Sequence, residues 1–315
     1  MTLFTGLVLQ ALYIGSEWAI VAVAFGLIAR TCRIYHLALG GLFSLGAYAT
    51  YFGIIQHGVG LIPTIIGATI LSGAVGALID RTIYQRVTGL YGQRQVSHLA
   101  PFVASLGVMI VIRNLLQLGF GASPVFMHAP RLGVTVLNGA SVETWRLLRA
   151  ALSLAAILIF GGWLRFTRAG VSTTALGQNA EGASVVGISE PLVRLQLFFL
   201  TGALAGFGGA LALLSHSIKP EDGFPVVLYG SLISLILPDA GVIVWWATSV
   251  AAALIFGIGV VWFGSGWEDT LLQGVLLGSL VVVRVILPRL RHWLRGRSRH
   301  TAIPTNIAAE ESSLV

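Results

Sequence analysis

The chain has 315 residues, of which 56% are hydrophobic and 10% are charged, whereas about 25% of the residues of an ordinary soluble domain are charged. With a mean hydropathy of +0.88, it holds more apolar residues than one globular core needs, which excludes a soluble enzyme and a disordered chain. The single cysteine, Cys32, excludes a disulfide framework and a zinc or iron–sulfur site built from cysteines of one chain. The formal net charge is +7. The basic residues lie between apolar runs without interleaved aromatic residues, so we expect no nucleic-acid partner.

Long apolar runs follow one another along most of the chain, and about 20 apolar residues suffice for a helix to cross a bilayer. The candidate spans are Leu3–Ala29, Ile34–Phe52, Leu61–Ile79, Leu99–Phe120, Leu147–Phe166, Leu192–Leu214, Pro225–Leu237, Val242–Phe263 and Thr270–Leu287. Because the seventh is shorter than the others, we expect an all-α, polytopic transmembrane bundle of eight or nine helices within residues 1–298. The polar residues 299–315 are expected to form a disordered tail.

Arginines gather in alternate breaks between the spans, and Lys and Arg accumulate in the short cytosolic loops of membrane proteins. The arginine-rich breaks are Arg30–Arg33, Asp80–Ser97, Arg165–Pro191 and the stretch after Leu287. We therefore expect these breaks to be cytosolic, with the N-terminus outside and the C-terminus in the cytosol. The break Gly121–Arg146 contains several glycines and prolines and is expected to be an extracytosolic surface loop.

The chain lacks the sequence patterns of an enzyme or an ATPase. A P-loop needs a lysine followed by Ser or Thr, and the only lysine, Lys219, is followed by Pro220. No histidine pair has the i,i+4 spacing with an intervening glutamate, and no G-x-S-x-G elbow occurs. We therefore expect no catalytic residue, no metal and no cofactor, and any use of ATP has to come from a partner.

The cytosolic break at residues 166–191 has the composition of a structured segment. Thr173–Val186 is compatible with a helix in which small and polar residues alternate; Gly187 supplies a C-terminal stop and Pro191 a start for the next span. A short helix on the cytosolic face is able to dock into a groove of another protein. The alternative is a solvated connector without a partner.

Motifs in and around this break resemble those of one transporter family. The pattern TRxGxxxRAxxQNxxAAxLxGI is matched by Thr167, Arg168, Gly170, Ala175, Gln178, Asn179, Ala183, Gly187 and Ile188. Arg33–Tyr48 resembles RIxNFAHGxLxxLGAY, and Leu78–Arg86 and Ser105–Gly121 resemble a helix exit and the fourth helix of the family. Over about residues 9–215 the chain thus resembles the permease subunit of bacterial branched-chain amino-acid ATP-binding cassette (ABC) importers, the LivH/LivM type.

This resemblance implies a subunit of the bacterial inner membrane that moves branched-chain amino acids, other amino acids, urea or short amides. The implied partners are two cytosolic ATP-binding subunits, a second permease subunit in a homo- or heterodimer, and an extracytosolic substrate-binding protein. The coupling helix that contacts the ATP-binding subunits would contain Ala175, Gln178, Asn179, Ala183 and Gly187. Small residues permit close approach to a groove, and the two amides are able to hydrogen-bond there without burying a charge.

The chain departs from the family pattern at two places. Where the family has Asn-Phe-Ala-His-Gly, this chain reads HLALG from His36 to Gly40, and the glycine-rich run after the sixth span is replaced by Leu228–Gly241. Since the central helices are expected to line the path, these changes leave the substrate open. Two other classes stay as alternatives: an ATP-independent channel or secondary transporter, although no inverted repeat is evident, and a non-transporting membrane scaffold.

Two charged residues are predicted to lie deep in the bilayer. Glu17 is about 20 Å from Arg30 at roughly 1.5 Å per helical residue, and Arg113 lies equally deep, where a lone charge costs at least about 2.5–3.5 kcal/mol. Because their charges are opposite, we predict a buried Glu17–Arg113 ion pair. The alternatives are a neutral Glu17 or separate wet cavities. His36 and Asn114 join these two as candidate residues of the translocation path.

A stripe of small residues marks the sixth span. Its members are Gly202, Ala205, Gly206 and Gly209. Small residues at i,i+4 spacing let helix backbones approach closely. We expect helix packing there, with a gate or a dimer seam as the alternative.

Overall fold

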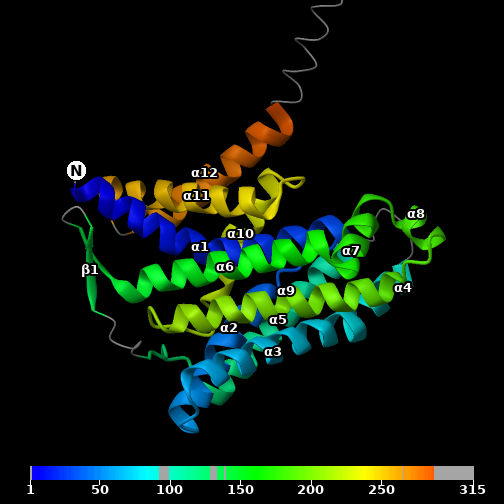
Figure 1. The fold of residues 1–315 in the computed structure, drawn as a ribbon, viewed down its shortest axis with the longest axis horizontal. Coiled ribbons are helices and arrows are strands. Elements are labelled where there is room, and N and C mark those ends of the chain that lie inside the picture. The colour runs from blue at the N-terminus through cyan, green and yellow to red at the C-terminus, as the bar shows by residue number, and fades with distance from the viewer. Residues whose placement is uncertain (1, 92–98, 128–132, 138–139, 265, 287–315) are drawn as a thin grey trace, which may run out of the picture.

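The computed structural model describes residues 2–286 except 92–98, 128–132, 138–139 and 265. The proposed domain boundary at residue 298 and the tail 299–315 lie outside the described residues. The described part is a helical bundle whose long helices run side by side (Figure 1). The expected fold class, an all-α transmembrane bundle, is therefore confirmed.

Six helices of the described part are long and apolar enough to cross a membrane. They include α1 (Thr2–Cys32), α3 (Leu61–Ile79), α5 (Leu99–Phe120), α6 (Thr144–Phe166), α9 (Glu190–Leu213) and α11 (Val242–Phe263). Most apolar-window residues of α1 and α9 are buried, whereas few of those of α5 are. The bundle is therefore built around α1 and α9.

Three of the nine expected spans are shorter helices. They are α2 (Leu39–Tyr51), which continues as the π-helix η1 (Phe52–Gln56), α10 (Gly223–Ile236), and α12 (Glu268–Val281), which continues as the π-helix η4 (Val282–Ile286). At about 1.5 Å per residue, the 14 residues of α10 cover roughly 21 Å, less than the hydrocarbon thickness of about 30 Å. The count of eight or nine spans thus becomes six long helices and three shorter ones in the described part.

The second expected span begins late because the chain is not helical between Cys32 and Leu39. Arg33 has a φ of 56°. This left-handed conformation cannot continue a helix, so α1 ends at Cys32. The following residues are largely buried although they are not helical, with Ile34 at 2% and His36 at 1% exposure. Irregular backbone of this kind is tolerated at membrane depth only where protein surrounds it.

The helices α2 and α10 begin against each other. A Cβ atom on Gly40 would lie 2.5 Å from the carbonyl oxygen of Gly223, and one on Gly223 would clash with the carbonyl oxygen of Gly40. Only glycine permits this approach of two backbones. The two short helices are thereby joined at their N-terminal ends.

Small residues of α9 lie where this helix crosses α2 and α3. A Cβ on Gly202 would lie 2.8 Å from the carbonyl oxygen of Ser72, and one on Gly209 would overlap the carbonyl oxygen of Phe43. A Cβ on Gly206 would overlap the Ser72 side chain, and Ala205 is fully buried. The stripe therefore serves as a packing surface between helices.

The break Gly121–Arg146, which was expected to be a surface loop, contains a β-hairpin. Strands β1 (Val134–Leu137) and β2 (Ala140–Glu143) pair antiparallel, with Val134 opposite Glu143. The hairpin lies at the end of the bundle that holds the N-terminus (Figure 1). Its alternating Val-Thr-Val pattern favours a strand with one exposed apolar face. Sequence reasoning missed this strand because the glycines and prolines around it indicated a loop.

At the opposite end of the bundle lie three short helices: α4 (Gln85–Tyr91), α7 (Arg168–Gln178) and α8 (Ala180–Val185). A π-helix, η2 (Asp80–Tyr84), joins α3 to α4. The two ends of the molecule therefore differ in kind: a β-hairpin at one, and a group of short helices at the other.

Candidate functional site

The break at residues 166–191 folds into two short helices, α7 and α8, that project from the end of α6. Thr167 caps α7, because its hydroxyl accepts a hydrogen bond from the amide of Gly170 at 3.0 Å. Asn179 caps α8 by accepting from the amide of Gly182 at 2.9 Å. The segment ends at Gly187, whose φ of +82° suits glycine. Its shape is thus fixed by local caps.

Ala183 lies inside this element. It is buried and forms a small apolar cluster with Leu176 and Val193, against which Ile188 packs. Its side chain therefore faces the core of the element itself and is not available to a partner. This corrects the expectation that Ala183 is a contact residue, which rested on residue size and not on the direction of the side chain.

The outer surface of the element is formed by other residues. Gln178, Asn179 and Gly187 are exposed, and so are two consecutive valines, Val185 at 86% and Val186 at 74%. Sequence reasoning missed the valines. The signal was present, because two β-branched apolar residues stand at the end of an otherwise small and polar segment.

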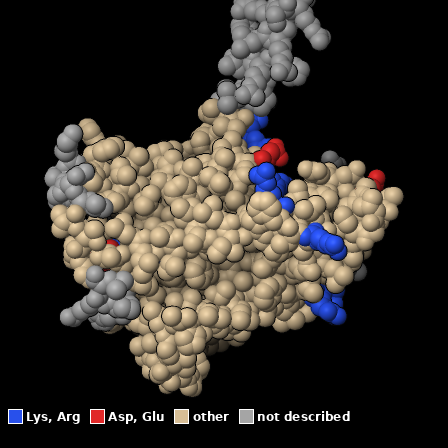
Figure 2. Space-filling view, viewed as in Figure 1, with Lys and Arg blue, Asp and Glu red and all other residues tan. Residues whose placement is uncertain are grey.

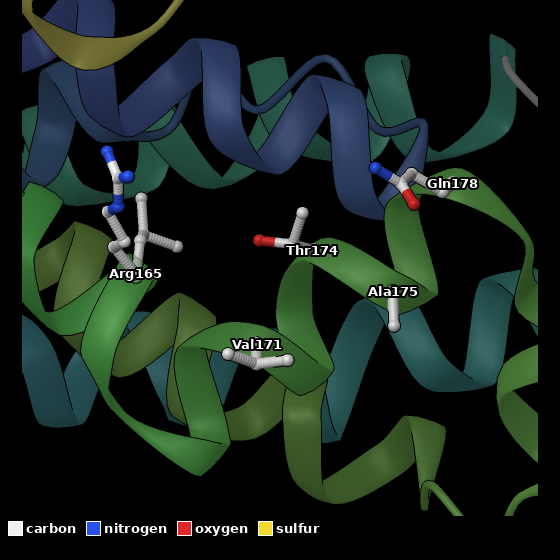
Figure 3. Close-up of a pocket in the computed structure, with 6 residues that line it drawn as sticks. Arg165, Val171, Thr174, Ala175 and Gln178 are labelled. Carbon is white, nitrogen blue, oxygen red and sulfur yellow. The ribbon is translucent and has the colours of Figure 1, made fainter.

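A hollow of about 400 Å³ lies between the end of α6 and α7. It is lined by Leu164, Arg165, Val171, Thr174, Ala175 and Gln178. Figure 3 shows Arg165 and Gln178 at opposite ends of this hollow, with Thr174 between them. Ala175 is half-buried in its wall. The hollow thus offers a guanidinium and an amide around a mostly apolar floor.

Glu17 pairs with a residue that the sequence did not suggest. Its Oε2 atom lies 2.9 Å from Nη1 of Arg149 on α6, and both side chains are almost fully buried. The guanidinium of Arg149 also lies over the ring of Tyr13, 5.4 Å from its centroid. The predicted Glu17–Arg113 pair is therefore wrong, because α6 and not α5 packs beside α1 at this level.

Arg113 pairs with Glu221, which precedes α10. Nη2 of Arg113 lies 3.2 Å from Oε2 of Glu221, and each side chain is 47% exposed. Asn114 is also exposed on α5. Both charges thus lie on an open face of the monomer instead of in its core.

His36 is buried in the non-helical connection between α1 and α2. Its Nδ1 atom lies 2.7 Å from the hydroxyl of Tyr84, and its ring packs edge-on against Tyr84 and Phe198. The His36 ring therefore joins this connection to η2 and α9.

A second buried ion pair joins η2 and α9, the two elements that His36 contacts, and sequence reasoning did not identify it. Nη2 of Arg194 on α9 lies 2.8 Å from Oδ1 of Asp80, which is fully buried at the start of η2. Gln85 donates to the other carboxylate oxygen at 2.9 Å. The only hint in the sequence was an acidic residue next to arginine in the helix exit Leu78–Arg86.

Within the described residues, no three His, Cys, Asp or Glu side chains are grouped so as to hold a metal ion.

The sequence matches the family described as branched-chain amino acid transport system, permease component, over residues 7–285. The chain belongs to this permease family. The expected resemblance is thereby confirmed, and it extends into the C-terminal third.

Individual relatives of this permease agree with the family. It is 24% identical over 225 residues to LivH, the high-affinity branched-chain amino acid permease protein of Escherichia coli K12, covering 67% of this chain and 71% of LivH. LivH of Salmonella typhimurium is 23% identical with the same coverage. The galactose/methyl galactoside import permease MglC of Haemophilus influenzae is 24% identical over 73% of this chain and 68% of its own length. No solved structure matches the chain.

The permease is thus a multi-pass protein of the ABC importer class, and its spanning helices and family place it in the inner membrane. Among the described residues, Glu17–Arg149 and Asp80–Arg194 are buried ion pairs, and Arg113 of α5 forms a half-exposed pair with Glu221. The exposed element α7–α8 and the open face of α5 are the parts of the described surface that these observations single out for contacts.

Proposed function

We propose that the protein is the membrane subunit of an importer driven by ATP-binding partner subunits, and that it moves branched-chain amino acids or related small polar solutes inward. The observation that carries this proposal is the family match over residues 7–285. By the same argument, its partners are two cytosolic ATP-binding subunits, a second permease subunit and an extracytosolic substrate-binding protein. The chain itself then supplies a path and a coupling surface, and it performs no catalysis.

The distribution of charge supports an orientation with α7 and α8 in the cytosol. Figure 2 shows that Lys and Arg on this face gather at the end where α7 lies, while most of the remaining surface carries no charge. Short cytosolic loops are enriched in Lys and Arg. This supports an N-terminus outside and a β-hairpin on the side from which a binding protein would deliver substrate.

The element α7–α8 is the proposed coupling surface for the ATP-binding subunits. Val185 and Val186 expose apolar side chains at its tip, and Gln178 and Asn179 offer amides beside them. Exposed apolar residues with a polar rim are typical of protein interfaces. The buried Ala183 cluster keeps α7 and α8 in a fixed arrangement, so the element is able to move as one rigid unit.

The coupling element continues directly into α9, which begins at Glu190. Arg194, one turn into α9, is bound to Asp80 at the end of α3, and α9 packs against α3 and α2 through its small residues. A displacement of α7–α8 would therefore move α9 and α3 together. This connection favours a coupled transporter over a non-transporting scaffold.

We propose that the open face of α5 either contacts the second permease subunit or lines a water-filled translocation path between the two permease subunits. Arg113 lies seven residues before Phe120, or about 10 Å from the end of α5 at roughly 1.5 Å per residue. Its half-exposed pair with Glu221 would be costly against lipid tails. Protein or water must therefore cover it in the membrane.

Transport assays test the function directly. The full chain is reconstituted in liposomes with its ATP-binding subunits, second permease and binding protein, and leucine uptake is measured with ATP or with a non-hydrolysable analogue. We expect uptake only with hydrolysable ATP. Uptake that is independent of ATP would indicate a channel or secondary transporter, and no uptake of any solute would indicate a scaffold.

The similarity to MglC supports a second candidate substrate class, small sugars. Galactose uptake is therefore measured in the same liposomes. Galactose uptake without leucine uptake would replace the amino-acid assignment while keeping the importer function.

A further inference from the structure

A polar cavity lies at the end of the bundle that carries α7, apart from the coupling surface and the α5 face. Its volume is about 370 Å³, and its walls come from the end of α1, from α7, from the turn after α10 and from η4. Three arginines line it, Arg30, Arg33 and Arg284, with a single carboxylate, Asp239. The lining therefore carries an excess of positive charge.

Asp239 attracts Arg30 electrostatically, but the described residues form no close ion pair with any of the three arginines. No ion pair within 4 Å joins Arg30, Arg33 or Arg284 to a described carboxylate. Arg284 donates from Nε to the carbonyl oxygen of Leu235 at 3.2 Å, which leaves its other nitrogens for a ligand. Arg33 is exposed and makes no hydrogen bond with another described residue. Guanidinium groups placed in this way are suited to the oxygens of a phosphate.

The cavity lies at the level of a membrane–water boundary. Arg30 is near the C-terminal end of the membrane-spanning helix α1, and its guanidinium lies over the buried ring of Trp245, 5.9 Å from the centroid. Tyr35, which is 41% exposed, lines the cavity. Exposed tyrosines are enriched at the level of lipid headgroups. A ligand in this cavity is therefore within reach of the headgroup region.

We propose that this cavity binds the phosphate of an anionic lipid headgroup, such as that of phosphatidylglycerol. The three guanidinium groups supply the charge and the hydrogen-bond donors, and the end of α1 together with the exposed Tyr35 places the cavity at headgroup depth. Basic pockets between membrane helices bind lipid phosphates in this manner. A bound lipid would join α1, the α10–α11 turn and η4, three elements that no described ion pair connects here.

The test uses the full-length chain in detergent and native mass spectrometry with phosphatidylglycerol, phosphatidylcholine or inorganic phosphate added. The variant is Arg30→Gln/Arg33→Gln/Arg284→Gln. The matched control, Arg81→Gln/Arg86→Gln/Arg168→Gln, removes the same charge from exposed arginines at the same end of the molecule. We expect the wild type and the control to bind phosphatidylglycerol equally, and the variant at least about tenfold more weakly, which corresponds to about 1.4 kcal/mol.

Three results would overturn the proposal. They are equal binding of phosphatidylglycerol by all three proteins, equal binding of phosphatidylcholine and phosphatidylglycerol by the wild type, and inorganic phosphate binding that the variant loses in the same way. The last would assign the cavity to a soluble anion. If the triple variant does not fold, Arg33→Gln/Arg284→Gln replaces it, since both side chains are exposed, and the same outcomes decide.

Discussion

Asp80 and Arg194 join the ends of α3 and α9 through a buried ion pair of 2.8 Å, directly beside the coupling element. Asp80 is fully buried, and Gln85 occupies its second oxygen. Glu190, at the start of α9, lies 3.6 Å from the same guanidinium. The pair is thus part of a small network that ties the first turns of α9 to the π-helix η2.

We expect Asp80→Leu and Arg194→Leu each to lower the free energy of unfolding by about 3–5 kcal/mol, because a buried charge loses its partner. The double variant should recover much of the loss. The measurement is unfolding of the full chain in detergent. Glu143→Leu/Arg146→Leu is the control pair; these side chains are 61% and 37% exposed, so we expect less than about 1 kcal/mol of coupling there. Additive losses for Asp80 and Arg194 would contradict the prediction.

A second cycle tests the pairing of Glu17. We expect Glu17→Leu and Arg149→Leu each to lower the free energy of unfolding by about 3–5 kcal/mol, because their charged atoms are 2.9 Å apart in the core. The double variant should recover much of this loss, which shows that the two residues are coupled. Glu17→Leu combined with Arg113→Leu serves as the control and should be additive. Coupling in the control cycle and none in the first would reverse the assignment.

The sequence predicts that Glu17 is buried, as it is in the structure, but its partner was not predictable. Distance along a helix gives depth at a fixed rise per residue, so a buried charge near the middle of α1 followed from the position of Arg30. The partner depends on which helix packs beside α1. Arg149 lies only five residues into α6, and the sequence placed it at the water-exposed end of its span.

The long helices were predictable because an apolar run of sufficient length has few other structures in a membrane. The short seventh span was also predicted and corresponds to α10. The close contact between Gly40 on α2 and Gly223 on α10 was not predictable, since these residues are 183 positions apart in the printed sequence. The prediction of which way the Ala183 side chain faces was wrong for a related reason. Composition indicated a small residue in a helix, whereas the structure decides which face it occupies.

The packing of α9 gives a third prediction. A Cβ at position 209 would overlap the carbonyl oxygen of Phe43, whereas one at Gly107 on α5 meets no atom within 4 Å. We expect Gly209→Val to destabilise the protein by at least about 1–3 kcal/mol, as overpacking does, and Gly107→Val to have a much smaller effect. Thermal unfolding in detergent measures both. Equal midpoints for the two variants would contradict the packing of α9 against α2.

Topology is tested by labelling single cysteines in a Cys32→Ala background. Gln178→Cys lies on the coupling element and Val136→Cys on the β-hairpin, and both positions are exposed. We expect a membrane-impermeant maleimide added to intact cells with a permeable outer membrane to label position 136 and not position 178, and to label both after lysis. Labelling of position 178 alone in intact cells would invert the proposed orientation.

The coupling surface gives the last prediction. Val185→Asp should reduce co-purification with the ATP-binding subunits and ATP-driven uptake by about tenfold or more, because burying an unpaired carboxylate in an interface costs several kcal/mol. Val185→Ala should have a smaller effect. Since Val185 is 86% exposed, neither change should alter the thermal stability of the isolated chain, whereas Ala183→Arg should unfold the buried cluster and is therefore a poor test of docking.

The matched control is Val136→Asp, which places the same charge on an exposed valine of the β-hairpin. It should leave co-purification with the ATP-binding subunits at the wild-type level, because it lies at the opposite end of the bundle (Figure 1). Normal co-purification and uptake with Val185→Asp would exclude the tip of α8 from the interface. A loss of co-purification with both aspartate variants would mean that the added charge disturbs assembly in general, and the docking site would then have to be sought elsewhere, beginning with the hollow between α6 and α7.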